Sequence, residues 1–124
     1  MTKNLDNDGL RSIVANYDIF YIDLWGVIHN GIILHKKAIE ALVEISKVNK
    51  NYVLLTNAPR PNRTVKKFLE KMGIDEKIRE KVYSSGEAAL NYLKKNHLSE
   101  KTFHLKNFFL SSLVRLHQMN ILFP

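Results

Sequence analysis

The chain has 124 residues, of which 45% are hydrophobic and 25% are charged, and its formal net charge is +7 at pH 7. This length and composition are sufficient for one domain with a packed core, and nothing in them suggests an intrinsically disordered chain. Because the sequence contains no cysteine, disulfides, thiolate metal sites and cysteine nucleophiles are excluded as well.

The positive charge has two interpretations. It is compatible with an acidic partner such as nucleic acid, a phosphate-bearing substrate or an anionic membrane. However, the lysines are scattered over the expected helices, which is typical of solvated helix faces and predicts no nucleic-acid partner. The N-terminus has no signal-peptide pattern, and no apolar run approaches the ~20 residues of a bilayer-spanning helix. We therefore expect a cytoplasmic protein without a membrane partner.

The first elements in chain order are a helix and a strand. Residues 9–17 carry apolar side chains at helical spacing, which predicts a short helix packed beside the first strand. The apolar run Ile19 to Ile22 suits a strand that is buried on both faces. Asp23 follows directly, and Gly26 lets the backbone turn. The carboxylate is therefore expected at the carboxyl end of the strand, where open α/β sheets bind ligands.

A second strand is expected to run parallel to the first. His29-Asn30-Gly31 has the composition of a turn, and residues 36–48 repeat apolar side chains every three or four positions, as in a helix with one buried stripe. Residues 52–55 then form a buried-type strand that ends on Thr56. Strand, helix and strand make a right-handed βαβ unit, which places Asp23 and Thr56 at the same edge of the sheet.

The chain continues with further helices and strands. A helix from Pro61 or Asn62 to Met72, ended by Gly73, would direct its first N–H groups towards the same edge and add an anion site. Residues 81–84 suggest a third strand, which Ser85-Gly86-Glu87 connects to another helix. Residues 102–105 suggest a fourth strand, and residues 106–124 form an apolar tail.

The stretch Asp23-Leu24-Trp25-Gly26-Val27-Ile28 resembles the first motif of the haloacid dehalogenase-like (HAD) superfamily, and its Asp-Leu-Trp-Gly-Val form resembles a branch of the NagD-like class IIA phosphatases. The resemblance implies the N-terminal half of a HAD core, an α/β fold with a Rossmann-like parallel sheet and flanking helices. It implies that Asp23 is the catalytic nucleophile and a magnesium ligand, with the backbone carbonyl of Trp25 as a second ligand. Trp25 stands where the family carries its acid/base Asp.

Further matches extend the resemblance along the chain. Thr56 resembles the second HAD motif, whose hydroxyl binds the substrate phosphate, and the following loop resembles the NagD-like branch, which implies phosphate contacts for Asn57 and Arg60. The Ser-Gly-Glu-Ala run at 85–88 is also similar to that branch. The resemblance covers residues 1–105, up to the start of the family's cap domain. Residues 106–124 depart from the family pattern, and we interpret this tail as a truncation or a frameshift.

The resemblance implies a phosphatase-type hydrolase that uses Mg2+ and a small phosphorylated substrate. The family's third-motif Lys and fourth-motif acidic pair have no match in this sequence, and an indole cannot shuttle protons as Asp does. The sequence therefore predicts an incomplete, inactive fragment, and a non-catalytic phosphate-binding or structural remnant is the alternative. An uncovered edge of the first strand would favour self-association.

Individual residues also have plainer interpretations. Asp23 could cap a turn after a strand, and threonine is common at the end of a strand. Arg60 and Arg63 could be ordinary solvent-exposed side chains. The five histidines show no metal-ligand spacing, and all of them, including His29 in the turn, are expected at the surface or in loops.

Overall fold

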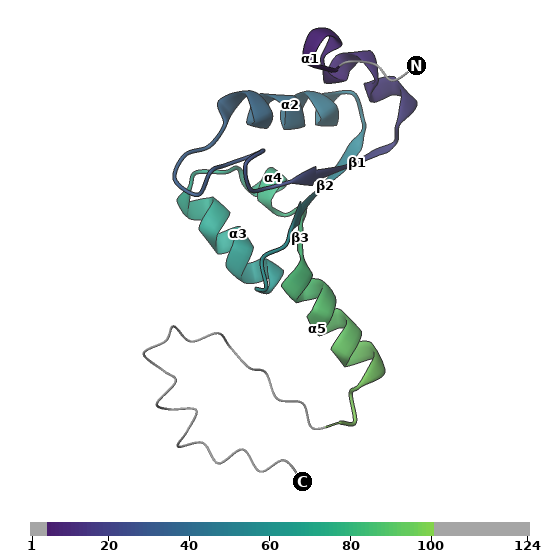
Figure 1. The fold of residues 1–124 in the computed structure, drawn as a ribbon, viewed down its shortest axis with the longest axis vertical. Helices are drawn as coiled ribbons and strands as arrows, with labels where there is room; N and C mark the ends of the chain where they lie inside the picture. The colour runs from purple at the N-terminus through teal and green to yellow at the C-terminus, as the bar shows by residue number, and fades with distance from the viewer. Residues whose placement is uncertain (1–4, 101–124) are drawn as a thin grey trace.

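The computed structural model describes residues 5–100. Its centre is a parallel sheet with strand order β1-β2-β3, shown in Figure 1. The strands are β1 (Ile19–Asp23), β2 (Asn51–Thr56) and β3 (Val82–Ser84). Asp23 is paired with Leu55, and Thr56 is paired with Ser84. All three strands therefore end at one edge, and the predicted Rossmann-like α/β arrangement is confirmed.

The helices that follow β1 and β2 pack on one face of this sheet. They are α2 (Lys36–Lys47), α3 (Asn62–Lys71) and the short α4 (Glu76–Arg79), and α5 (Ser85–Asn96) follows β3. Leu42 of α2 and Leu69 of α3 are buried in the same apolar cluster as Leu54 of β2. The helix predicted from Pro61 or Asn62 to Met72 is confirmed as α3, whose C-cap is Met72, and Gly73 follows with a φ of 85° that suits a glycine after a helix.

The opposite face of the sheet is exposed within the described residues. In β1 the exposed positions Ile19, Tyr21 and Asp23 alternate with the half-buried Phe20 and Ile22. The prediction that β1 is buried on both faces is therefore wrong for the part of the chain that the structure describes. The helices between the strands cover only the side of Phe20 and Ile22, because two right-handed crossovers in the same direction place them on the same face.

The N-terminal segment differs from the helix predicted over residues 9–17. It contains α1 (Leu5–Asp8) and two 3-10 turns, η1 (Leu10–Ser12) and η2 (Val14–Asn16). Ile13 separates the turns with φ −122° and ψ −11°, which are not helical values. Serine, asparagine and β-branched residues all have weak helix propensity, so the segment forms two separate turns. Leu10 still packs against the core cluster.

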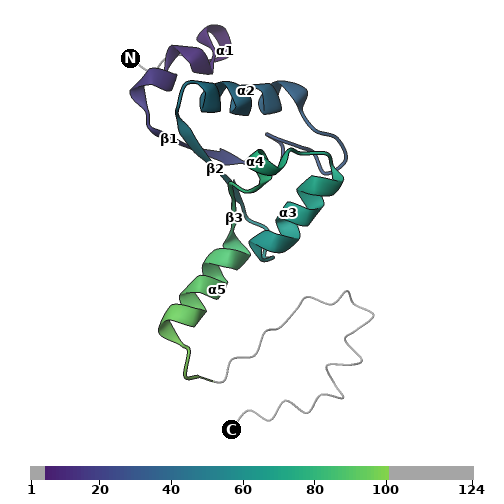
Figure 2. The same ribbon diagram turned by 180° about the vertical axis from the view of Figure 1, so that it is seen from behind.

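Helix α5 extends away from the other helices, as Figures 1 and 2 show from opposite sides. None of its residues is buried by the described part of the chain. The predicted strand at residues 102–105, the apolar tail 106–124 and the boundary between them lie outside the described residues. Within residues 5–100, no helix is both long and apolar enough to cross a bilayer.

Candidate functional site

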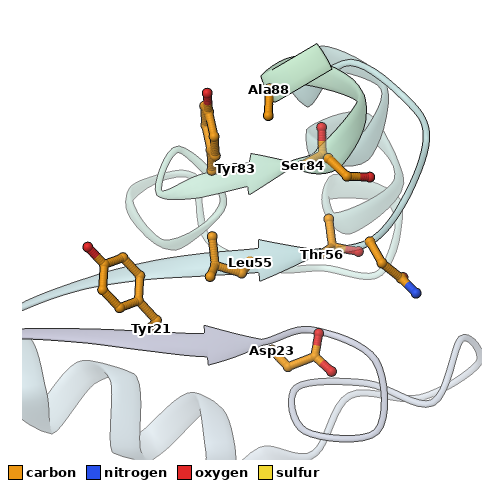
Figure 3. A pocket seen from close by; sticks show the side chains of 9 residues that line it. Tyr21, Asp23, Leu55, Thr56, Tyr83, Ser84 and Ala88 are labelled. Carbon is orange, nitrogen blue, oxygen red and sulfur yellow. The ribbon is translucent and has the colours of Figure 1, made fainter. Parts of the chain in front are cut away.

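An open cleft of about 450 Å3 lies at the edge where the strands end. Its lining combines acidic, hydroxyl and amide side chains with apolar and aromatic ones. They are Asp23, Thr56, Asn57, Ser84 and Ser85, together with Tyr21, Leu55, Tyr83 and Ala88. Figure 3 shows Asp23 and Thr56 at the ends of their strands, with Tyr21 and Leu55 further back along them. The cleft therefore has a polar end and an apolar wall.

Asp23 is the only carboxylate among the residues that line this cleft. Its Oδ1 accepts a hydrogen bond of 2.8 Å from the N–H of Leu24, a residue that is itself buried in the core. Gly26 then adopts φ 77°, which turns the chain away from the sheet. The carboxylate is left exposed at the end of β1, as the sequence predicted.

Thr56 lies one position beyond Leu55, the partner of Asp23 in β1. Its Oγ1 accepts a hydrogen bond of 3.2 Å from the N–H of Ala58, which orients the hydroxyl at the start of the following loop. Paired residues of a parallel sheet share a face and successive residues alternate. Asp23 and Thr56 therefore meet at the edge of the sheet from its two faces, and both line the cleft.

The loop after Thr56 places its predicted phosphate ligands differently. Asn57 lines the cleft, whereas Arg60 does not. The backbone carbonyl of Arg60 accepts a hydrogen bond of 2.5 Å from the Ser84 hydroxyl, and Arg60 as a whole is exposed. The first N–H of α3, that of Asn62, donates to Glu87 Oε2 at 2.9 Å. The sequence predicts that the N–H groups at the start of α3 bind an anion. In the structure the first of these N–H groups is already bonded to the Glu87 carboxylate.

His29 lies in the loop between β1 and α2, one of the two positions expected for the histidines, but it is buried there, with only 6% of its surface exposed. Its Nδ1 accepts a hydrogen bond of 3.0 Å from the N–H of Gly31. Its ring meets those of Trp25 and Phe68 edge-on, with centroids 5.9 and 5.5 Å apart. Burial lowers the pKa of His29, nearby His35 lowers it further, and Asp23 acts in the opposite direction.

Trp25, at the family's acid/base position, is not among the residues that line the cleft. Its side chain is 62% exposed and contacts the hairpin that follows it in the chain. That hairpin is closed by the Asn30 side chain, which accepts the N–H groups of Ile32 and Ile33. The predicted turn at His29-Asn30-Gly31 is present, with Gly31 at φ 91°.

Ser84 and Ser85 line the cleft but are absent from the predicted phosphate ligands. The relevant signal in the sequence is the spacing Ser84-x-x-Glu87, which is that of a capping box at a helix start. In the structure Ser84 is the N-cap of α5 and accepts the N–H of Glu87 at 3.1 Å. The serine that ends β3 and caps α5 is therefore also a lining residue.

The residues predicted to bind magnesium supply oxygen donors of the kind that this ion prefers. They are the Asp23 carboxylate and the backbone carbonyl of Trp25, two residues further along. Mg2+ is often bound through one or two carboxylates, with substrate phosphate and water completing its ligands. Among residues 5–100, no group of three or more His, Cys, Asp or Glu side chains could hold a metal ion. Asp23 and the Trp25 carbonyl therefore fit a magnesium site in which the protein supplies one carboxylate.

Comparison with known proteins gives matches of sequence and of structure. A family model described as "Haloacid dehalogenase-like hydrolase" matches residues 20–117. A hydrolase of the haloacid dehalogenase-like family from Brucella suis 1330 is 28% identical, with a TM-score of 0.63, and the match covers 77% of this chain and 35% of that one. The comparison with curated proteins gave no match.

Two more solved structures are similar. A putative NagD protein is 25% identical with a TM-score of 0.56, and the match covers 64% of this chain and 32% of that one. A 4-nitrophenylphosphatase from Thermotoga maritima is 23% identical with a TM-score of 0.59, covering 68% and 33%; at this identity the likeness shows the fold alone. The chain spans about a third of the length of these proteins.

Proposed function

Because the chain belongs to the haloacid dehalogenase-like hydrolase family, we propose that its cleft binds the phosphoryl group of a small phosphate ester and that Asp23 is the nucleophile of phosphoryl transfer. The family prediction made from the Asp-Leu-Trp-Gly-Val motif is confirmed by the match over residues 20–117. The observation that carries the proposal is that Asp23 and Thr56, the two motif residues, line one cleft where neighbouring parallel strands end.

In the proposed reaction a carboxylate oxygen of Asp23 forms a bond to phosphorus while the bond between phosphorus and the ester oxygen breaks. Water then hydrolyses the aspartyl phosphate and releases inorganic phosphate. The Thr56 hydroxyl and the Asn57 amide, which both line the cleft, would donate hydrogen bonds to phosphoryl oxygens. Magnesium, when bound to Asp23 and the Trp25 carbonyl, would offset the negative charge of the phosphoryl group.

The departing alcohol needs a proton, and residue 25 does not provide one. The indole of Trp25 has an N–H donor but no group that exchanges protons near neutral pH. General acid/base assistance is typically worth ~10²- to ~10⁴-fold in rate. We therefore propose that this chain by itself is a very slow or inactive phosphatase, and that its nucleophile is tested better by a phosphoryl analogue than by turnover.

The test uses trifluoroberyllate, a phosphoryl mimic that aspartate carboxylates bind in the presence of Mg2+. Fluorine NMR is expected to show a bound signal with the full chain and none with Asp23→Asn. Asp18→Asn is the matched control, because Asp18 precedes the same strand at its opposite end, where it pairs with Lys50. A bound signal that survives in Asp23→Asn, or no bound signal with the unaltered chain, would refute the proposed nucleophile.

A second candidate function is non-catalytic phosphate binding, or a purely structural role. It is favoured by one observation: the Trp25 side chain contacts Gly31 and is not among the residues lining the cleft. Calorimetric titration with inorganic phosphate and Mg2+ separates these possibilities. Heat of binding without a trifluoroberyllate adduct indicates a binding module, and the absence of both indicates a structural role.

A further inference from the structure

The loop after β2 is fastened to the first turn of α5. The backbone carbonyl of Ala58 accepts hydrogen bonds from the Gly86 N–H at 3.1 Å and from the Ser85 hydroxyl at 3.0 Å. The Arg60 carbonyl accepts from the Ser84 hydroxyl. Two backbone carbonyls of the loop 57–61 are thereby held by three successive residues, 84–86, at the start of α5.

The helices α3 and α5 each supply one hydrogen-bond acceptor to the start of the other, while Ser84 also caps α5 itself. In an ordinary capping box, Glu87 would bond back to the N–H of Ser84. Here the Ser84 N–H donates to Asn62 Oδ1, and Glu87 Oε2 accepts the N–H of Asn62, both at 2.9 Å. Each helix start therefore depends on a side chain from the other, and the loop 57–61 lies between them.

Gly86 lets the two segments approach closely. A Cβ at this position would stand 2.4 Å from the backbone nitrogen of Arg60 and 2.7 Å from its carbonyl carbon and oxygen. Backbone atoms cannot move aside as the end of a flexible side chain does. The glycine is required by this contact, and any side chain at residue 86 would push the loop away from α5.

We propose that Asn62, Gly86 and Glu87 are positioning residues for the loop 57–61, and that through it they set the affinity of the cleft for phosphate. None of the three is among the lining residues, whereas Thr56 and Asn57 are. The carboxylate of Glu87 occupies the first N–H of α3, so phosphate contact is left to Thr56, Asn57 and the loop. This inference rests on the proposed function, because it treats the loop 57–61 as part of a phosphate-binding site.

The test compares Glu87→Ala and Glu87→Asp with Glu87→Gln, using inorganic phosphate in the presence of Mg2+ as the probe. Glutamine keeps the length and an acceptor oxygen, whereas alanine removes the acceptor and aspartate is too short to reach Asn62. Alanine or aspartate is expected to weaken phosphate binding about tenfold, since a hydrogen bond to a charged group is lost. Glutamine is expected to restore affinity to within about threefold. Glu44→Ala on α2, which removes an exposed pair with Lys47, is the matched control.

Amide NMR spectra provide a readout that does not depend on phosphate. In Glu87→Ala and in Gly86→Ala, the resonances of Ala58 and Arg60 are expected to move and their hydrogen exchange to accelerate, while those of α2 stay unchanged. Unchanged loop resonances in Glu87→Ala, or equal phosphate affinity of the alanine and glutamine variants, would overturn the positioning role. If the unaltered chain binds no phosphate, the proposed function fails, and the amide spectra still decide whether Glu87 positions the loop. Should Glu87→Ala not fold, Glu87→Asp serves in its place.

Discussion

The indole of Trp25 lies against the backbone of Gly31, so closely that a Cβ on Gly31 would stand 2.7 Å from the indole Cζ3. The edge of the same ring system meets His29 at an interplanar angle of 90°. Trp25 is the single tryptophan of the chain. Its fluorescence therefore reports directly on the hairpin that follows the candidate nucleophile.

Gly31→Ala is expected to displace this indole and to destabilise the hairpin. The residue has φ 91°, a conformation that costs alanine about 1–2 kcal/mol, and the new methyl group would collide with the ring. Tryptophan emission should shift and the midpoint of urea unfolding should fall. Gly73→Ala is the control, because Gly73 has φ 85° but open space around it. It should lower stability without changing the emission of the folded protein, and equal spectral changes in both variants would contradict the contact.

Stability is expected to decrease as the pH falls below the ordinary pKa of histidine, about 6.5. Burial lowers the pKa of His29 in the folded protein, so the unfolded chain binds the proton more readily. Protonation would also remove the Nδ1 acceptor of the Gly31 N–H. The stabilisation is complete above the unfolded pKa and is lost as the pH falls through the folded value. Urea unfolding between pH 8 and pH 5 should show this loss, and His29→Gln should reduce its slope.

Leu54→Ala is expected to cost about 2–5 kcal/mol of the free energy of unfolding, the usual range for a leucine removed from a packed core. The Leu54 side chain is fully buried, with 0% of its surface exposed. Leu55→Ala is the matched control, because Leu55 faces the open side of the sheet and is 37% exposed. Denaturant titration of both variants should give a clearly larger loss for Leu54. Similar losses would mean that the face carrying Leu55 is also covered.

Tyr21→Lys is expected to reduce self-association of the chain. Tyr21 is 67% exposed, and β1 pairs only with β2 among the described strands. An edge strand with exposed apolar side chains can pair with another chain, and lysine on such a strand opposes that pairing. Sedimentation velocity over a range of concentrations would measure the effect. If the unaltered chain is monomeric at every concentration, the predicted self-association is wrong.

Local sequence patterns were sufficient for most of the fold and for the core of the site. The apolar stripe of α2, with Leu42 and Ile45 buried, follows from spacing alone. The meeting of Asp23 and Thr56 follows from the rule that a βαβ unit brings two strand ends to one edge. Both inferences depend on local patterns and on the pairing of the strands, and on no other contact between residues distant in sequence.

The errors concern burial and partners that come from distant segments. An apolar run such as residues 19–22 has the same pattern whether one face or both faces are covered, so the sequence predicts two buried faces where the structure shows one. His29 is buried partly by Phe68 of α3, which its local turn sequence does not reveal. The N–H of Asn62 is taken by Glu87, 25 positions further along the chain, and the anion site expected at α3 could not be judged without that contact.

The reciprocal hydrogen bonds between the starts of α3 and α5 have a consequence for folding. Fraying of either helix at its first turn removes an acceptor from the other, so the two starts are expected to open as one cooperative unit. The Ser84 and Asn62 amides should then share a single opening free energy, although they lie on different elements of the chain. Local motion at this edge would be all-or-none instead of gradual, and it would release the whole loop between the two helices at once.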